Sequence, residues 1–325
     1  MDIELLSNQL ISGDRRALAK GITLIESRSA NHTKEAKKLL ESVIPYSGKS
    51  IRIGISGVPG VGKSTIIESL GLYLIDNGYK VAVLAVDPTS HITGGSILGD
   101  KTRMENLSRD ENAFIRPSPS GGSLGGVARK TRESIFLCEA SGYDVVIVET
   151  VGVGQSEVAV SSMTDFFLLM QLPNAGDELQ GIKRGIMEIS NAIIVNKADG
   201  ENLHSASIAK KQLENVLHIL KPAESGWVTP VILASAVENK GIEEIWTVVR
   251  KYVKTMKSNG RFSEKRKRQA REWMWSVVMD GLKDMLTNCE YIKNYAPILE
   301  KSVDEKCTTP SLAAEEILNI FKTNC

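Results

Sequence analysis

The residues between Gly57 and Thr65 have the types and spacing of a phosphate-binding loop. They contain the pattern Gly-x-x-x-x-Gly-Lys-Ser, directly after a short apolar strand and at the start of a helix. Glycines let backbone N–H groups turn toward phosphate oxygens, and the helix N-terminus adds partial positive charge. Lys63 is predicted to bridge the β- and γ-phosphates of a nucleotide, and the Ser64 hydroxyl to bind Mg²⁺. The predicted phosphate-binding residues are Gly57, Val58, Pro59, Gly60, Val61, Gly62, Lys63, Ser64 and Thr65.

Two acidic residues stand at the ends of predicted buried strands. Asp87 follows the apolar segment 80–86, and Glu149 follows the segment 144–148. Ligands of open parallel sheets bind beyond the carboxyl ends of the strands, so both carboxylates are expected on the phosphate side. Glu149 also begins Glu-Thr-Val-Gly, which is similar to the Asp-x-x-Gly of many GTPases. Gly152 is then expected to donate its N–H to the γ-phosphate. A strand cap before Pro88 is the alternative role for Asp87.

A second motif predicts which base the nucleotide carries. Asn196-Lys-Ala-Asp199 follows the apolar strand 192–195. The Asp199 carboxylate can accept hydrogen bonds from both N1–H and the exocyclic amine of guanine, an arrangement that adenine lacks, so ATP is disfavoured. The Lys197 stem is expected to cover the base and Asn196 to brace the loop, while a backbone N–H after the last strand reads O6. The predicted base-binding residues are Asn196, Lys197, Asp199, Ser235, Ala236 and Val237.

These motifs need a parallel sheet to position them. Short apolar segments alternate with segments of helical pattern, and near-continuous apolarity indicates strands buried on both faces. We therefore predict an α/β fold of the P-loop NTPase type, with a mostly parallel sheet between helices. Strands are predicted at 51–56, 80–86, 144–148, 166–171, 192–195 and 231–233, and helices include 127–140, 205–220 and 242–256.

Helical extensions are predicted at both ends of this domain. Residues 1–47 have the periodicity of two or three amphipathic helices, the G domain is predicted over 48–257, and the segment 258–325 shows no further strand. A basic run at 261–271 enters a tryptophan-containing helix, and a short final helix is predicted at 311–321. Such a run can bind nucleic acid, but it is more often a solvated helix face.

Composition excludes several classes of protein. With a net charge of +1 over 325 residues, there is no global reason to expect a nucleic-acid or membrane partner. The N-terminal segment mixes charged with apolar residues, unlike a signal peptide, and no apolar run is long enough to span a membrane. We expect a cytoplasmic chain with reduced thiols, because the cysteines are scattered: Cys138, Cys289, Cys307 and Cys325.

Together these motifs resemble the MeaB/ArgK family of SIMIBI-class P-loop GTPases, over about residues 10–255. The resemblance implies a GTP-hydrolysing chaperone that gates cofactor loading, protection and reactivation of an adenosylcobalamin-dependent acyl-CoA mutase of the methylmalonyl-CoA mutase type. It also implies a homodimer formed with the C-terminal helices. Besides the phosphate loop, the stretches that carry the resemblance are 12–19, 87–90, 94–104, 149–157 and 176–183.

The resemblance also assigns roles that the residues alone leave open. Asp100 lies in a Gly-rich polar loop, where composition does not decide its function, and it matches a family switch acid. Asp177 and Lys183 match a third switch loop, in which the lysine would stabilise developing charge. The alternative for Lys183 is a solvated helix face. The resulting catalytic set is Lys63, Asp87, Asp100, Glu149 and Lys183, and the Mg²⁺ set is Ser64, Asp87, Asp100 and Glu149.

Two other functions are compatible with a GTPase of this class. A metallochaperone would deliver nickel or zinc, but the histidines and cysteines form no ligand cluster. The family has also been described as a transport-system kinase, for which no phosphoryl-acceptor site is recognisable. Whether Gln155 positions the attacking water stays open.

Overall fold

The computed structural model describes residues 2–27, 29–86, 104–117, 124–150, 156–173, 184–219 and 226–325. The chain forms two compact units, Met1–Ser263 and Glu264–Cys325. The predicted segments 1–47, 48–257 and 258–325 stay predictions.

The first unit contains a seven-stranded sheet in the order β3-β2-β4-β1-β5-β6-β7, with every neighbouring pair parallel. This confirms the predicted fold class. All six predicted strands are present, with ends that differ from the expected ones by at most about two residues. Among the strands that the structure describes, the short edge strand β3 was not predicted, because its four residues carry too little periodic pattern. The strands are β1 (Ile51–Gly57), β2 (Val81–Val86), β3 (Ala113–Arg116), β4 (Val145–Thr150), β5 (Phe166–Gln171), β6 (Ala192–Val195) and β7 (Val231–Leu233).

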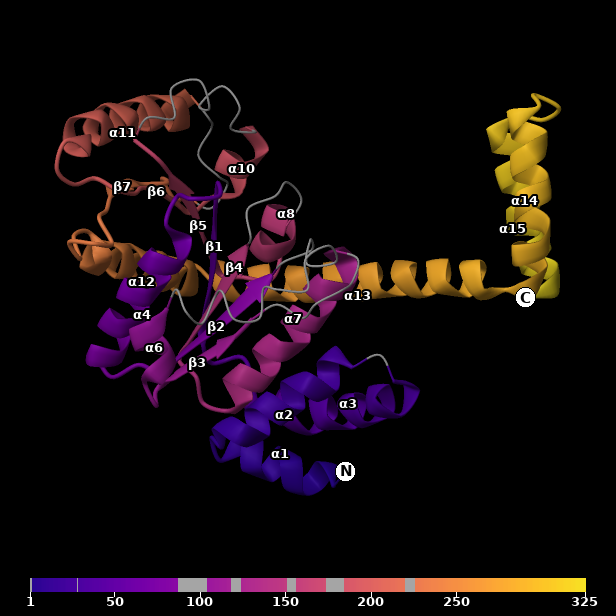
Figure 1. Ribbon diagram of the computed structural model, residues 1–325, viewed down its shortest axis with the longest axis horizontal. Helices are drawn as coiled ribbons and strands as arrows, with labels where there is room; N and C mark the ends of the chain where they lie inside the picture. Colours follow the sequence, from indigo (N-terminus) through magenta and orange to yellow (C-terminus); the bar gives the residue numbers. More distant parts are fainter. Residues whose placement is uncertain are drawn as a thin grey trace. The chain divides into compact units, whose positions relative to one another are not determined.

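Helices cover both faces of the sheet (Figure 1). One face packs against α4 and α12, and the other against α7 and α8. Strand side chains alternate between these faces, so Ile147 joins the first core and Val148 the second. The helices of this unit are α1 (Ile3–Ile11), α2 (Arg15–Glu26), α3 (Ala30–Val43), the 3₁₀ helix η1 (Ile44–Tyr46), α4 (Lys63–Asp76), α6 (Glu105–Arg109), α7 (Leu124–Ala140), α8 (Ser156–Ser161), α10 (Arg184–Ile189), α11 (Asn202–Ile219) and α12 (Ile242–Ser258).

The N-terminal helices α1, α2 and α3 share the second core rather than standing apart from it. Leu10, Leu18, Ile22 and Leu39 are fully buried and belong to the same cluster as residues of β4 and α7. Burial of these four side chains contributes roughly 1.5–3 kcal/mol each. The amphipathic pattern at the N-terminus therefore reflects packing on the G domain.

The second unit consists of helices with a small core. It holds most of α13 (Arg261–Asn288), together with α14 (Glu290–Asp304) and α15 (Pro310–Asn324). The last two helices pack side by side, and their buried apolar residues are Ile292, Leu299 and Ala313. Helix α14 was not predicted from the sequence. It contains Pro297, a residue that normally interrupts a helix.

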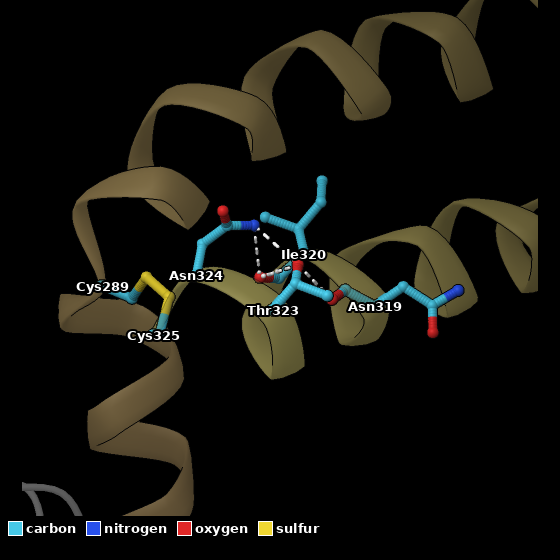
Figure 2. Close-up of a disulfide and its surroundings, with 6 residues drawn as sticks. All are labelled: Cys289, Asn319, Ile320, Thr323, Asn324 and Cys325. Atoms are coloured by element: carbon cyan, nitrogen blue, oxygen red, sulfur yellow. Dashed lines mark hydrogen bonds between the residues drawn. A yellow bond between two sulfur atoms is a disulfide. The ribbon is translucent and has the colours of Figure 1, made fainter.

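A disulfide joins Cys289, the N-cap of α14, to Cys325 at the end of α15 (Figure 2). The expectation that the cysteines stay reduced was therefore wrong for this pair. The two residues are 36 apart in sequence, and only the pairing of α14 with α15 brings their Cα atoms within 6.2 Å. Cys138, which is buried, and Cys307, which is exposed, are free thiols. Across the described ranges, no helix is both long and apolar enough to cross a membrane.

Candidate nucleotide-binding site

The predicted phosphate loop lies between β1 and α4, at the carboxyl edge of the sheet. Gly62 is the N-cap of α4 and has a φ of 92°, in the left-handed region that favours glycine. A Cβ at this position would lie 2.6 Å from Nδ2 of Asn196. The loop therefore requires glycine here for two reasons, its backbone conformation and its close approach to the base motif.

Lys63 is 8 % exposed, and its ammonium group is held inside the loop. Its Nζ donates to the carbonyl oxygen of Gly57 at 2.8 Å and to that of Val58 at 3.3 Å. Backbone oxygens thus compensate part of the burial cost of the charge. The same ammonium is available to phosphate oxygens, because a triphosphate in the loop would offer stronger, charged acceptors.

Ser64, in the first turn of α4, contacts Glu149 in β4. The Ser64 hydroxyl donates to Oε1 of Glu149 at 3.4 Å, and Glu149 is only 6 % exposed. A hydroxyl and a carboxylate are hard oxygen donors, which suits Mg²⁺. Among the residues that the structure describes, no group of three or more His, Cys, Asp or Glu could hold a metal.

The base motif is braced against both the phosphate loop and the last strand. Asn196 is 2 % exposed, and its Nδ2 donates to the carbonyl oxygen of Val61 at 2.8 Å. Asp199 is half-buried and accepts a hydrogen bond from the hydroxyl of Ser235. Lys197 has a φ of 59°, a conformation that is uncommon for residues other than glycine and that clusters at functional sites. The carboxylate predicted to read guanine is therefore held in place.

The loop after β7 supplies the other side of the predicted base site. The hydroxyl of Ser69 in α4 donates to the carbonyl oxygen of Ala236 at 3.2 Å, while Val237 is 84 % exposed. Sequence analysis missed Ser69, because the two residues are 167 apart and no spacing rule connects them. Beside this loop, the hydrogen bond from Lys240 to Glu238 raises the pKa of the lysine.

The structure brings together the predicted phosphate-loop residues, the described acid Glu149 and the predicted base-binding residues at one edge of the sheet. Five other predicted site residues lie outside the described residues, and their roles stay predictions: Asp87, Asp100, Gly152, Asp177 and Lys183. Gln155 lies outside them as well.

A parallel sheet with a Gly-rich phosphate loop and an Asn-Lys-x-Asp motif at its carboxyl edge defines a P-loop GTPase. Within that class, the family model described as "Methylmalonyl Co-A mutase-associated GTPase MeaB" matches residues 18–290. The chain belongs to this family, and it is a GTPase.

Individual relatives agree with this assignment over nearly the whole chain. The chain is 50% identical over 321 residues to a "Putative GTPase" of Caulobacter vibrioides, covering 99% of this chain and 98% of the relative. It is 49% identical over 316 residues to "GTPase ArgK" of Escherichia coli, covering 97% and 95%. It is 41% identical over 331 residues to the mouse "Methylmalonic aciduria type A homolog, mitochondrial", covering 99% and 80%.

A solved structure shows the same fold. The "Crystal structure of LAO/AO transport system kinase" superposes with a TM-score of 0.81 at 37% identity, covering 99% of this chain and 98% of that chain. The alignment includes residues of both compact units.

Proposed function

We propose that this GTPase is a chaperone of an adenosylcobalamin-dependent acyl-CoA mutase of the methylmalonyl-CoA mutase type. Its GTP hydrolysis gates the loading, protection and reactivation of the cofactor on that mutase. The observation that carries the proposal is the family match over residues 18–290, since the family's description names this mutase. The name of the mouse relative refers to methylmalonic acid metabolism and supports the same partner.

The described side chains have distinct roles in this proposal. Lys63 contacts the β- and γ-phosphates and stabilises the charge that develops during transfer. Ser64 and Glu149 hold Mg²⁺, which supplies charge neutralisation at the phosphates when bound. Asp199, oriented by Ser235, selects guanine. Asp87 and Asp100 complete the predicted metal and switch acids, and Lys183 is the charge-stabilising residue that mutase docking brings in.

The proposal also includes a cytoplasmic homodimer. The segment that would form its interface, 258–325, exposes large apolar side chains on α13, among them Trp275, Met279 and Met285. Solvent-exposed residues of this size are expected where helices meet another chain.

The test is to purify the chain with a candidate adenosylcobalamin-dependent mutase and to measure complex formation and GTP turnover, each with and without the mutase. We expect a nucleotide-dependent complex and a change in turnover. Absence of both with every candidate mutase would contradict the proposal. Transfer of the γ-phosphate to a transport-system protein would instead favour the kinase function for which the solved relative is named.

A further inference from the structure

The sheet divides into two halves at its carboxyl edge. Strands β1 and β4 pair from Ile51 with Val145 up to Ile55 with Glu149. Beyond that pair, β1 continues alongside β5, where Gly57 is opposite Met170, while β4 continues alongside β2, where Thr150 is opposite Val86. In the described ladder, β1 and β4 therefore lose their backbone pairing one residue before the phosphate loop begins.

A side-chain hydrogen bond joins the two strands at this point. Oγ1 of Thr150 donates to Oγ of Ser56 at 2.8 Å, and both residues are fully buried. Each hydroxyl belongs to the last or the penultimate residue of its strand. This hydrogen bond offsets part of the desolvation cost of both buried hydroxyls, and removing either one leaves its partner with that cost.

The two halves carry different parts of the site. In the half made of β1, β5, β6 and β7, the phosphate loop follows β1, and the two segments of the base site follow β6 and β7. The half made of β4, β2 and β3 carries Glu149 at the end of β4. The 3.4 Å contact from Ser64 to Glu149 therefore crosses the division.

The side chain of Thr150 does not lie on the face of the sheet that packs against α4. Side chains alternate along β4, so Thr150 points with Val148 toward α7 and α8, and Glu149 points with Ile147 toward α4. Any effect of Thr150 on the reaction must then pass through the backbone that it shares with Glu149.

We propose that Thr150 is a positioning residue for GTP hydrolysis. Its hydrogen bond to Ser56 fixes the end of β4 against the end of β1, and so sets the place of the Glu149 carboxylate relative to Ser64 and Lys63. Catalysis is sensitive to such placement, because a displacement of about 1 Å at the reacting groups costs on the order of 100-fold. Nucleotide binding in the absence of Mg²⁺ depends on the other half of the sheet and is spared. The inference rests on the metal-holding role proposed above for Ser64 and Glu149.

The test compares Thr150→Val, which keeps the shape and removes the hydroxyl, with Thr150→Ser, which restores it. The matched control is Thr131→Val in α7, since Thr131 is also buried but donates to its own helix, to the carbonyl oxygen of Val127. Each variant is assayed without any mutase, for kcat and KM with GTP, for the Mg²⁺ concentration at half-maximal rate, and for GDP binding with and without Mg²⁺. Thermal unfolding checks that each variant is folded.

For Thr150→Val we expect kcat to fall about tenfold and the half-maximal Mg²⁺ concentration to rise severalfold. The extra GDP affinity that Mg²⁺ provides should shrink, while GDP affinity without Mg²⁺ stays within about twofold. Thr150→Ser should recover most of kcat, and Thr131→Val should resemble the unmodified protein. Unchanged kcat and Mg²⁺ dependence in Thr150→Val would overturn the proposal, as would an equal effect in Thr131→Val.

Ser56→Ala provides an independent route if Thr150→Val does not fold. When the hydrogen bond carries the effect, Ser56→Ala lowers kcat similarly, and the double variant is no worse than either single variant. Additive losses would show that the two hydroxyls act separately and would overturn the proposal. Because no mutase is present, these outcomes are independent of whether the mutase is the partner.

Discussion

The strands on either side of the β1–β4 boundary bring different side chains to the nucleotide edge. The β1 side holds Lys63 and Ser64 in the phosphate loop and Asp199 in the base site. The β4 side brings the described acid Glu149. Nucleotide binding thus depends on the β1 side, whereas hydrolysis needs side chains from both sides, and hydrogen bonds at the boundary connect them.

The two sides of the boundary also differ in how their site residues are held in place. On the β1 side, Asn196 and Ser235 hold neighbouring loops by hydrogen bonds. On the β4 side, Glu149 accepts a longer hydrogen bond, at 3.4 Å, from Ser64. We therefore expect small shifts at the boundary to lower the rate of hydrolysis more than they weaken nucleotide binding.

The largest effect is expected from Lys63→Ala on the β1 side. It removes the ammonium that contacts the phosphates, so kcat should fall about 1,000-fold and GTP should also bind more weakly. Turnover and binding titrations with GTP and GDP measure both. Retention of full turnover would break the assignment of phosphate contact to this residue.

The next effect is expected from Glu149→Gln, which tests the β4 side alone. The neutral amide has nearly the same shape but is a poor Mg²⁺ ligand, so kcat should fall about 100-fold. GDP affinity measured without Mg²⁺ should change little. If that affinity fell as much as kcat, the separation of binding from hydrolysis would not hold.

Asp199→Asn tests the base site, again on the β1 side. The amide cannot accept from both guanine donors, so GTP affinity should fall about 30-fold, while kcat at saturation changes little. Competition by GTP, ATP and xanthosine triphosphate is the measurement. Xanthosine triphosphate should gain relative to GTP, since its base has a carbonyl where guanine has the amine. Unaltered preference for GTP would contradict the role of Asp199.

The smallest effect on turnover is expected from Cys289→Ser, which lies outside the sheet. The disulfide closes a loop of 36 residues and stabilises it by about 3–4 kcal/mol through chain entropy. The helical hairpin that it closes, α14 and α15, has few buried residues, so loss of the disulfide should matter there. Limited proteolysis should cut 289–325 faster, while intrinsic GTP turnover stays within about twofold. Cys307→Ser is the matched control and should change neither. Equal protease resistance would show that helix packing alone holds the hairpin.

Sequence patterns were most informative where chemistry restricts residue type. The loop at 57–65 and the motif at 196–199 were recognisable because phosphate and guanine require particular groups at fixed spacing, and burial on both faces made the strands apolar. Contacts between distant segments left no such pattern. The Cys289–Cys325 disulfide, the Ser69 hydrogen bond to Ala236 and the Thr150–Ser56 pair all depend on how strands and helices are placed. Helix α14 was hidden by its internal proline.

The close approach of Gly62 to Asn196 has a consequence for interpreting natural variants. A substitution at Gly62 would be classified by position as a defect in phosphate binding. Yet the added Cβ would lie 2.6 Å from the Asn196 amide, which braces the base motif. Such an allele should therefore also lose part of its discrimination between guanine and adenine nucleotides, and a screen that used GTP alone would record only half of its phenotype.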